Sequence, residues 1–144
     1  MIKTIRDVLN TKGSEVLCIN ADASVYQALE MMAANNVGAV IVKKKDVIVG
    51  IISERDYARK VILQGRSSPS TTVENIMTTD VCYITPDKTV EDGLALMTDK
   101  RCRHLPVFDG EEMFGLVSIG DLAKAQVAEK EFIINQLENY IKSG

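Results

Sequence analysis

The strongest constraint on the fold is an internal repeat, which aligns the chain with itself at an offset of 65 residues. The ungapped match pairs residues 19–62 with residues 84–127. Ten of the 44 aligned positions are identical, whereas ordinary composition would give about 3 by chance. Two copies of one supersecondary unit therefore make up most of the 144 residues.

Each copy carries the same succession of predicted elements. Apolar side chains recur at helical spacing directly after Ser24 and Thr89, two residues that favour helix N-caps. Two β-branched runs follow in each copy, separated by a short polar turn, and predict a hairpin: residues 39–42 and 47–52, then 104–108 and 113–117. A short strand opens each copy, near residues 16–19 and 81–84, and a second helix closes it. The predicted unit is βαββα, and the predicted fold class is α+β with two such repeats and a C-terminal helical extension.

The repeat also predicts where the parts of the chain begin and end. We expect a first repeat with its N-terminal segment at residues 1–64, a polar linker at 65–72, a second repeat at 73–127 and a C-terminal helix at 128–144. The last helix carries an apolar stripe that one small unit does not fully cover: Phe132, Ile133, Leu137, Tyr140 and Ile141. Packing against a second copy and docking on the same chain both remain open.

Charge and hydropathy exclude several classes of protein. Seventeen Lys and Arg against 20 Asp and Glu give a formal charge of −3 without a basic block, so duplex DNA is not an expected partner. The longest apolar runs fall far short of the ~20 residues that cross a bilayer, and the first residues have no secretory apolar segment. We therefore expect a soluble, cytoplasmic protein that does not enter a membrane.

Cysteine and histidine usage gives little support to an enzyme. Cys18, Cys82 and Cys102 match neither metal-ligand spacing nor a disulfide framework, and His104 is the only histidine. Cys102 stands between two arginines that could lower its pKa, although packing is the favoured role for a lone thiol there. Neither a catalytic metal site nor a nucleophilic triad is predicted.

The motif that is most informative about function is glycine, two apolar residues and then Ser-x-x-Asp. It occurs at Gly50–Asp56 and again at Gly115–Asp121. One interpretation is a capping box, which only stabilises the helix start. The other is a ligand site, because a helix N-terminus attracts phosphate and a neighbouring carboxylate can accept from ribose hydroxyls. Aspartate is shorter than the Glu or Gln that a capping box prefers, which favours the ligand site.

These motifs, within tandem βαββα units and with the stretch Arg103–Val107, make the chain resemble a stand-alone pair of CBS (cystathionine beta-synthase type) domains. The resemblance covers nearly the whole chain. It implies a non-catalytic regulatory module without a catalytic cofactor, which binds an adenosine-containing ligand and acts on a separate, unidentified protein. AMP is the favoured ligand, with ATP, ADP, NAD and S-adenosylmethionine as alternatives. It also implies a homodimer.

The resemblance further implies two unequal ligand clefts. The tighter cleft would place phosphate and ribose on the first-repeat motif, with cations from the second repeat and adenine along an adjoining backbone segment: Ser53, Arg55, Asp56, Arg103, His104, Asp80, Val81 and Cys82. The weaker cleft would use the second-repeat motif and residues of the first repeat: Ser118, Gly120, Asp121, Val16, Gly38, Ala39 and Lys12. Gly38 and Ala39 match Arg103 and His104 but carry no charge, so this cleft lacks cations for phosphate unless Lys12 compensates. The alternative function is a structural dimerisation module whose clefts are empty and whose Ser-x-x-Asp segments only cap helices.

Overall fold

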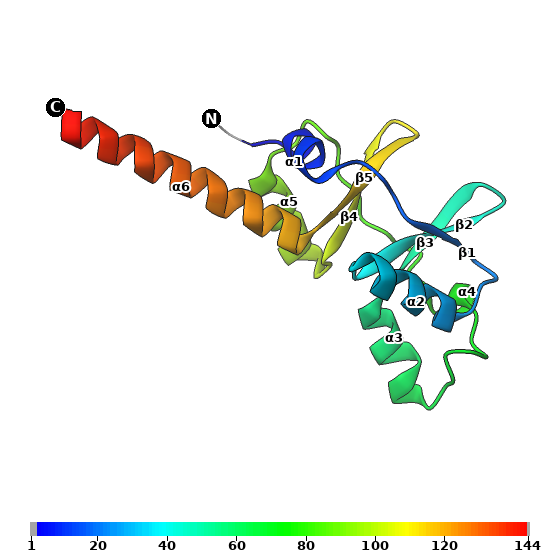
Figure 1. Ribbon diagram of the computed structural model, residues 1–144. Helices are drawn as coiled ribbons and strands as arrows, with labels where there is room; N and C mark the ends of the chain where they lie inside the picture. The colour runs from blue at the N-terminus through cyan, green and yellow to red at the C-terminus, as the bar shows by residue number, and fades with distance from the viewer. Residues whose placement is uncertain (1–2, 144) are drawn as a thin grey trace. The chain divides into compact units, whose positions relative to one another are not determined.

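The structure is a computed structural model that describes residues 3–143 (Figure 1). The chain divides into two compact units. We call residues 16–81 the central unit, and residues 3–15 together with 82–143 the terminal unit.

The central unit contains the complete predicted repeat. Its elements are β1 (Cys18–Asn20), α2 (Val25–Asn35), β2 (Ala39–Lys44), β3 (Val47–Ser53), α3 (Glu54–Lys60), the 3-10 turn η1 (Ile62–Gln64) and α4 (Val73–Ile76). The sheet has the order β1-β2-β3, with β1 parallel to β2 and β2 antiparallel to β3. The predicted hairpin is confirmed, and its strands extend to a tight turn at Lys45 and Asp46, both of which have positive φ.

The core of the central unit lies between α2 and the sheet. Val25, Ala28 and Met32 on one face of α2 are buried, as their helical spacing predicts. Val73 and Ile76 of α4 are also buried in this core, although α4 begins the predicted second repeat at 73–127. The predicted linker at 65–72 packs here too, since the Thr71 carbonyl accepts a hydrogen bond from the Val25 N–H.

The terminal unit is built from the second repeat and the N-terminal segment. Its elements are α1 (Ile5–Lys12), α5 (Val90–Lys100), β4 (His104–Asp109), β5 (Glu112–Ser118) and α6 (Ile119–Ser143). The antiparallel pair β4-β5 confirms the second predicted hairpin. The helix predicted at 128–144 continues α6 without a break, and Gly144 lies outside the described residues. Within residues 3–143, no helix is both long and apolar enough to span a membrane.

The opening strand predicted at residues 81–84 is wrong as a strand. Only an isolated parallel bridge between Ile84 and Val107 forms there. In the first repeat the Ile41 N–H donates to the Leu17 carbonyl, and Pro106 occupies the position equivalent to Ile41. Proline has no N–H, so the second repeat cannot form this ladder bond.

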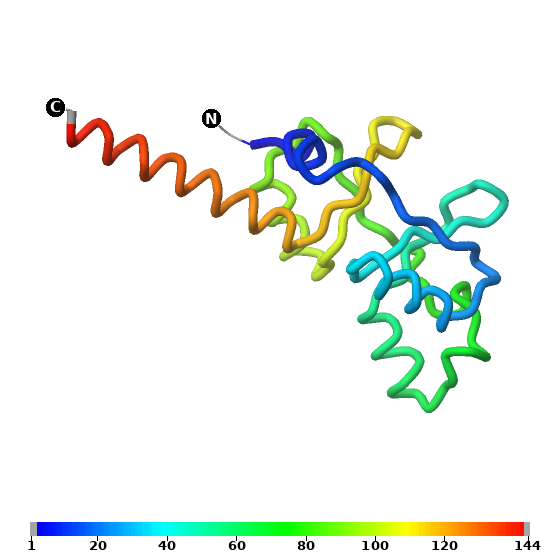
Figure 2. Tube along the Cα trace, viewed as in Figure 1, coloured from blue at the N-terminus to red at the C-terminus, as the bar shows by residue number. Residues whose placement is uncertain are grey.

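Helix α1 packs with the second repeat rather than with the repeat that it precedes. Ile5, Val8 and Leu9 are buried in one cluster with Leu105 and with other residues of the second repeat. Figure 2 shows this N-terminal segment, in blue, beside the yellow segment of β5. Repeat boundaries and packing units therefore differ: residues 3–15, expected with the first repeat at 1–64, belong to the terminal unit, and α4 belongs to the central unit.

Candidate functional site

In the central unit, the predicted Ser-x-x-Asp site forms where β3 ends and α3 begins. The Ser53 N–H donates to Asp56 Oδ2 at 2.9 Å, and the Asp56 N–H donates to Ser53 Oγ at 3.2 Å. The Ser53 hydroxyl also donates to Asp56 Oδ2, at 3.1 Å. Asp56 is only 9% exposed, so its carboxylate is held rigidly at the first turn of α3.

Two partners of Asp56 were not predicted from the sequence. Thr78 Oγ1 donates to Asp56 Oδ1 at 3.1 Å, and Lys60 Nζ lies 3.3 Å from the same oxygen. The spacing of Lys60, four residues after Asp56 on a helix, could have predicted the ion pair. Nothing in the local pattern marks Thr78, because its position depends on backbone pairing with Ile51.

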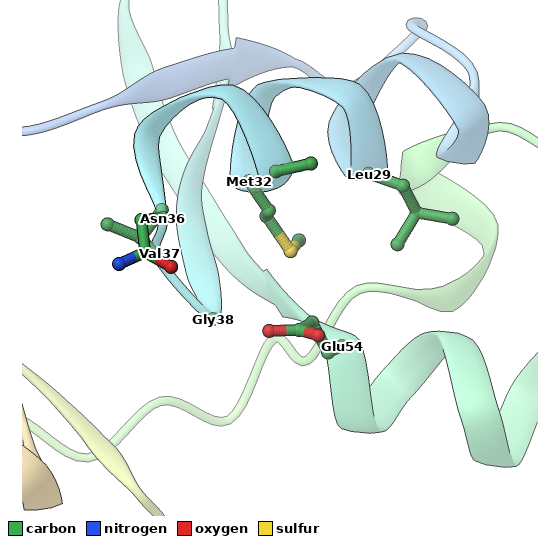
Figure 3. A pocket seen from close by; sticks show the side chains of 7 residues that line it. Leu29, Met32, Asn36, Val37, Gly38 and Glu54 are labelled. Atoms are coloured by element: carbon green, nitrogen blue, oxygen red, sulfur yellow. The ribbon is translucent and has the colours of Figure 1, made fainter.

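Gly38 and Ala39 lie beside this same helix start. Ala39 pairs with Ser53 in the sheet, and the Gly38 carbonyl accepts from the Glu54 N–H at 3.0 Å. Gly38 and Glu54 also line a pocket of about 290 Å³ with the C-terminal half of α2 (Figure 3). Its other lining residues are mostly apolar: Leu29, Met32, Ala33, Asn36 and Val37.

The equivalent site in the terminal unit has different partners. The Ser118 N–H donates to Asp121 Oδ2 at 2.8 Å, and the Asp121 N–H donates to Ser118 Oγ at 3.1 Å. Lys12 Nζ, from α1, lies 2.5 Å from Asp121 Oδ2 and donates to the Leu116 carbonyl. The bond from the Ser118 N–H and the contact with Lys12 both fall on Oδ2. The structure thus places Lys12, the predicted compensating cation, directly on the carboxylate.

Electrostatics inside this site holds Asp121 charged. Burial raises the pKa of Asp121, but the hydrogen bond and charge of Lys12 and the bonds from Ser118 outweigh burial. The net pKa therefore lies below its ordinary value of 3.8. Asp121 is an anion over the whole physiological pH range.

His104 pairs with Ser118 at the end of the β4-β5 hairpin, and the Arg103 carbonyl accepts from the Ile119 N–H. Burial lowers the pKa of His104 below 6.5, and the charges of Lys12 and Arg103 lower it further against the opposing effect of Asp121. His104 is therefore neutral at pH 7. Burial of His104 opposes its predicted role as a phosphate-binding cation, and the roles of His104 and Arg103 at a phosphate stay predictions.

The cysteines of the terminal unit are packing residues. Cys82 and Cys102 both pack against its apolar core. Burial raises the pKa of the Cys102 thiol, and the neighbouring Cys82 raises it further. The flanking arginines do not activate Cys102, which supports the packing interpretation favoured from the sequence.

The remaining predicted residues fall in both units. Arg55 lies in the first turn of α3 and Gly120 in the first turn of α6, next to the two aspartates. Asp80 is exposed, whereas Val16 and Val81 are partly buried. Val16, Asp80 and Val81 belong to the central unit and Cys82 to the terminal unit, so their predicted contact with adenine stays a prediction.

The capping interpretation of Ser-x-x-Asp is confirmed as local geometry. Ser53 and Asp56 form a complete capping box, and so do Thr4 with Asp7 and Thr89 with Asp92. Aspartate at the third helical position therefore reaches the N-cap N–H as readily as a longer acid would. The argument that the shorter side chain favours a ligand role is therefore wrong.

Comparison with known proteins identifies the class. The CBS domain family matches residues 5–62 and 73–128, so the chain belongs to this family. It is 43% identical over 150 residues to "CBS domain-containing protein CBSX3, mitochondrial" of Arabidopsis thaliana, covering 98% of this chain and 73% of that protein. It is 31% identical over 123 residues to CBS domain-containing protein YhcV of Bacillus subtilis, covering 85% and 87%. A solved CBS-domain crystal structure is 44% identical, with a TM-score of 0.83 over 88% of this chain and 99% of that chain.

Membership in the CBS domain family indicates the general role of this protein. Pairs of CBS domains are generally regulatory, ligand-binding modules, and stand-alone CBS-domain proteins are generally non-catalytic. Within the described residues, no cluster of three or more His, Cys, Asp or Glu could hold a metal ion. Because the Arabidopsis relative is labelled mitochondrial, a cytoplasmic location stays a prediction.

Proposed function

We propose that this chain is a sensor of adenosine-containing nucleotides, which binds its ligand at Asp56 and Asp121 and regulates a separate protein. The observation that carries the proposal is the duplicated strand-to-helix junction, at which a serine N–H fixes an aspartate in the first helical turn. A carboxylate in this place can accept from both ribose hydroxyls, while the helix N-terminus attracts phosphate. The two junctions use the same chemistry with different neighbours.

At Asp56 the ligand must replace an existing contact. A carboxylate offers about four lone-pair positions, and Asp56 already contacts the Ser53 N–H, the hydroxyls of Ser53 and Thr78, and Lys60. Ribose hydroxyls would therefore displace Lys60 or a hydroxyl. At Asp121 the bond from the Ser118 N–H and the contact with Lys12 both fall on Oδ2, so we propose that a ribose hydroxyl binds at Oδ1.

Charge favours Asp56 as the tighter site for phosphorylated ligands. A phosphate monoester carries about −1.5 to −2 charges at neutral pH, and each charge-assisted hydrogen bond contributes roughly 1.5 to 3 kcal/mol. We propose that Arg55 and Arg103 contact the phosphate of the nucleotide at Asp56. Since His104 is neutral, the two arginines supply this charge without it.

The test begins with thermal melts of the whole chain in AMP, ADP, ATP, NAD and S-adenosylmethionine. A ligand at 100 times its dissociation constant should add about 2.7 kcal/mol to the free energy of unfolding. Calorimetric titration with the stabilising nucleotide should then show that Asp56→Ala abolishes the tight site and that Asp121→Ala affects only a weaker one. Arg103→Ala should weaken AMP far more than adenosine.

The matched aspartate variants also test the assignment. If Asp121→Ala removes the tight site and Asp56→Ala does not, the contacts already made by Asp56 outweigh the arginine charges and the assignment is reversed. Equal losses would mean that the two sites are equivalent.

The second candidate function is a structural dimerisation module. It is favoured by the capping box at Ser53 and by the matching bonds at Ser118, since helix stability alone explains them. Under this candidate no nucleotide of the panel raises the melting temperature, and Asp56→Ala only lowers it. Under either candidate we propose that the chain associates with a second copy of itself.

A further inference from the structure

The C-terminal part of α6, from residue 127 onward, exposes a series of large apolar side chains. Val127, Ile134, Leu137 and Ile141 are 56%, 53%, 57% and 75% exposed. In the first half of the same helix, Leu122 is fully buried in the core of the terminal unit. Figure 1 shows the later turns, towards the red end, continuing beyond the strands β4 and β5 of this unit. The terminal unit therefore buries Leu122 but leaves the apolar side chains from residue 127 onward exposed.

The spacing of these residues is that of a helix that pairs with another helix. Val127, Ile134 and Ile141 are seven residues apart, and Leu137 follows Ile134 by three. β-branched residues at the first position of a heptad and leucine at the fourth are typical of two-stranded coiled coils. Lys130 occupies the earlier fourth position, where its apolar stem can lie along the seam.

Charge and area indicate what covers this face. Residues 127–143 hold three glutamates and two lysines, whereas helices that lie on anionic membranes have a polar face rich in Lys and Arg. The exposed parts of the seam residues and of Ile133 amount to about 500 Å² per copy, or about 1,000 Å² for a pair, which reaches the lower limit of a specific interface. A second copy of the same face would match it in hydrophobicity and length.

We propose that residues 127–143 of α6 form the surface at which two copies of this chain pair, helix against helix, through Val127, Ile134, Leu137 and Ile141. The inference rests on the proposed self-association and names its surface. Of the predicted stripe, Leu137 and Ile141 belong to this seam, whereas Phe132 lies on the other side of the helix. For the seam residues, the inference favours pairing with a second copy over docking on the same chain.

The experiment compares two substitutions on opposite sides of the helix in the full-length chain. Leu137→Glu places a charge in the seam. Phe132→Glu is the matched control, because Phe132 is 56% exposed and lies about 140° away around the helix. Light scattering should give about twice the chain mass of 15.8 kDa for the wild type and for Phe132→Glu. Leu137→Glu should raise the dissociation constant of the dimer at least tenfold.

Ile134→Glu provides an independent second variant, and circular dichroism with urea denaturation checks that each variant remains folded. If both seam variants keep the wild-type dissociation constant of the dimer, this surface is refuted while self-association stands. If Phe132→Glu dissociates the dimer equally, the seam is not specific and the inference fails. A monomeric wild type would refute the inference and the proposed self-association together, and α6-dependent binding to lipid vesicles by that monomer would identify a membrane as the occupant instead.

Discussion

The two motif glycines, Gly50 and Gly115, are equivalent in the repeat but face different neighbours, so the same substitution should have unequal effects. A Cβ added at Gly50 would lie 2.6 Å from the backbone oxygen of Thr78. A Cβ added at Gly115 would lie 2.7 Å from Cδ2 of Leu9, at the end of a flexible side chain. A side chain can rotate away from such a contact, whereas a paired backbone segment cannot.

The magnitude follows from what must move. The segment at Thr78 is joined to Ile51 by two backbone hydrogen bonds, of 2.8 and 3.0 Å. Overpacking typically costs 1–3 kcal/mol, and each net hydrogen bond contributes about 0.5–1.5 kcal/mol. We expect Gly50→Ala to lower the free energy of unfolding by roughly 2–3 kcal/mol and Gly115→Ala by about 1 kcal/mol. Displacement of Thr78 would also remove its hydrogen bond to Asp56, which competes with the ribose hydroxyls, so nucleotide affinity should rise in folded Gly50→Ala.

Urea denaturation of the two variants and the wild type measures the difference, with fluorescence and circular dichroism recorded together to detect separate unfolding of the units. Nucleotide titration of the folded variants then tests the link to Asp56. A loss of stability in Gly115→Ala equal to or larger than that in Gly50→Ala would refute the reasoning from backbone contact.

Two further predictions follow from the shifted pKa values of the terminal unit. Because the pKa of folded His104 is below 6.5, the unfolded chain binds a proton at pH values where the folded chain does not, so the free energy of unfolding should fall as the pH decreases through about 6.5. His104→Gln should make the free energy of unfolding depend less on pH near this value. Urea denaturation at several pH values between 7 and 5 measures this dependence, and the same dependence in His104→Gln and the wild type would contradict the lowered pKa of His104. Because burial and Cys82 raise the pKa of Cys102, its alkylation by iodoacetamide at pH 8 should be several-fold slower in the native than in the urea-unfolded chain. Peptide mass spectrometry measures this rate for each cysteine, and equal rates in the two states would show that Cys102 is not protected.

Local features of this protein follow from the sequence alone. The 65-residue repeat, the N-caps Ser24 and Thr89 and the two hairpins are confirmed. The N-caps and the hairpin turns depend on residues only a few positions apart, whose hydrogen bonds form in any context that allows a helix or a turn. The Ser-x-x-Asp contacts at Ser53 and Ser118 belong to this class, since they join residues three apart.

The tertiary structure alone decided which distant segments complete each core and each site. The apolar residues of α1 and α4 do not by themselves specify the repeat against which they pack, because burial is favourable against any apolar surface of suitable shape. The packing placed α1 on the second repeat, and this brought Lys12 to Asp121 across 109 positions of sequence. In the same way, the pairing of Thr78 with Ile51 brought the Thr78 hydroxyl to Asp56. These partners depend on three-dimensional complementarity between surfaces, which periodicity and spacing along one segment do not encode.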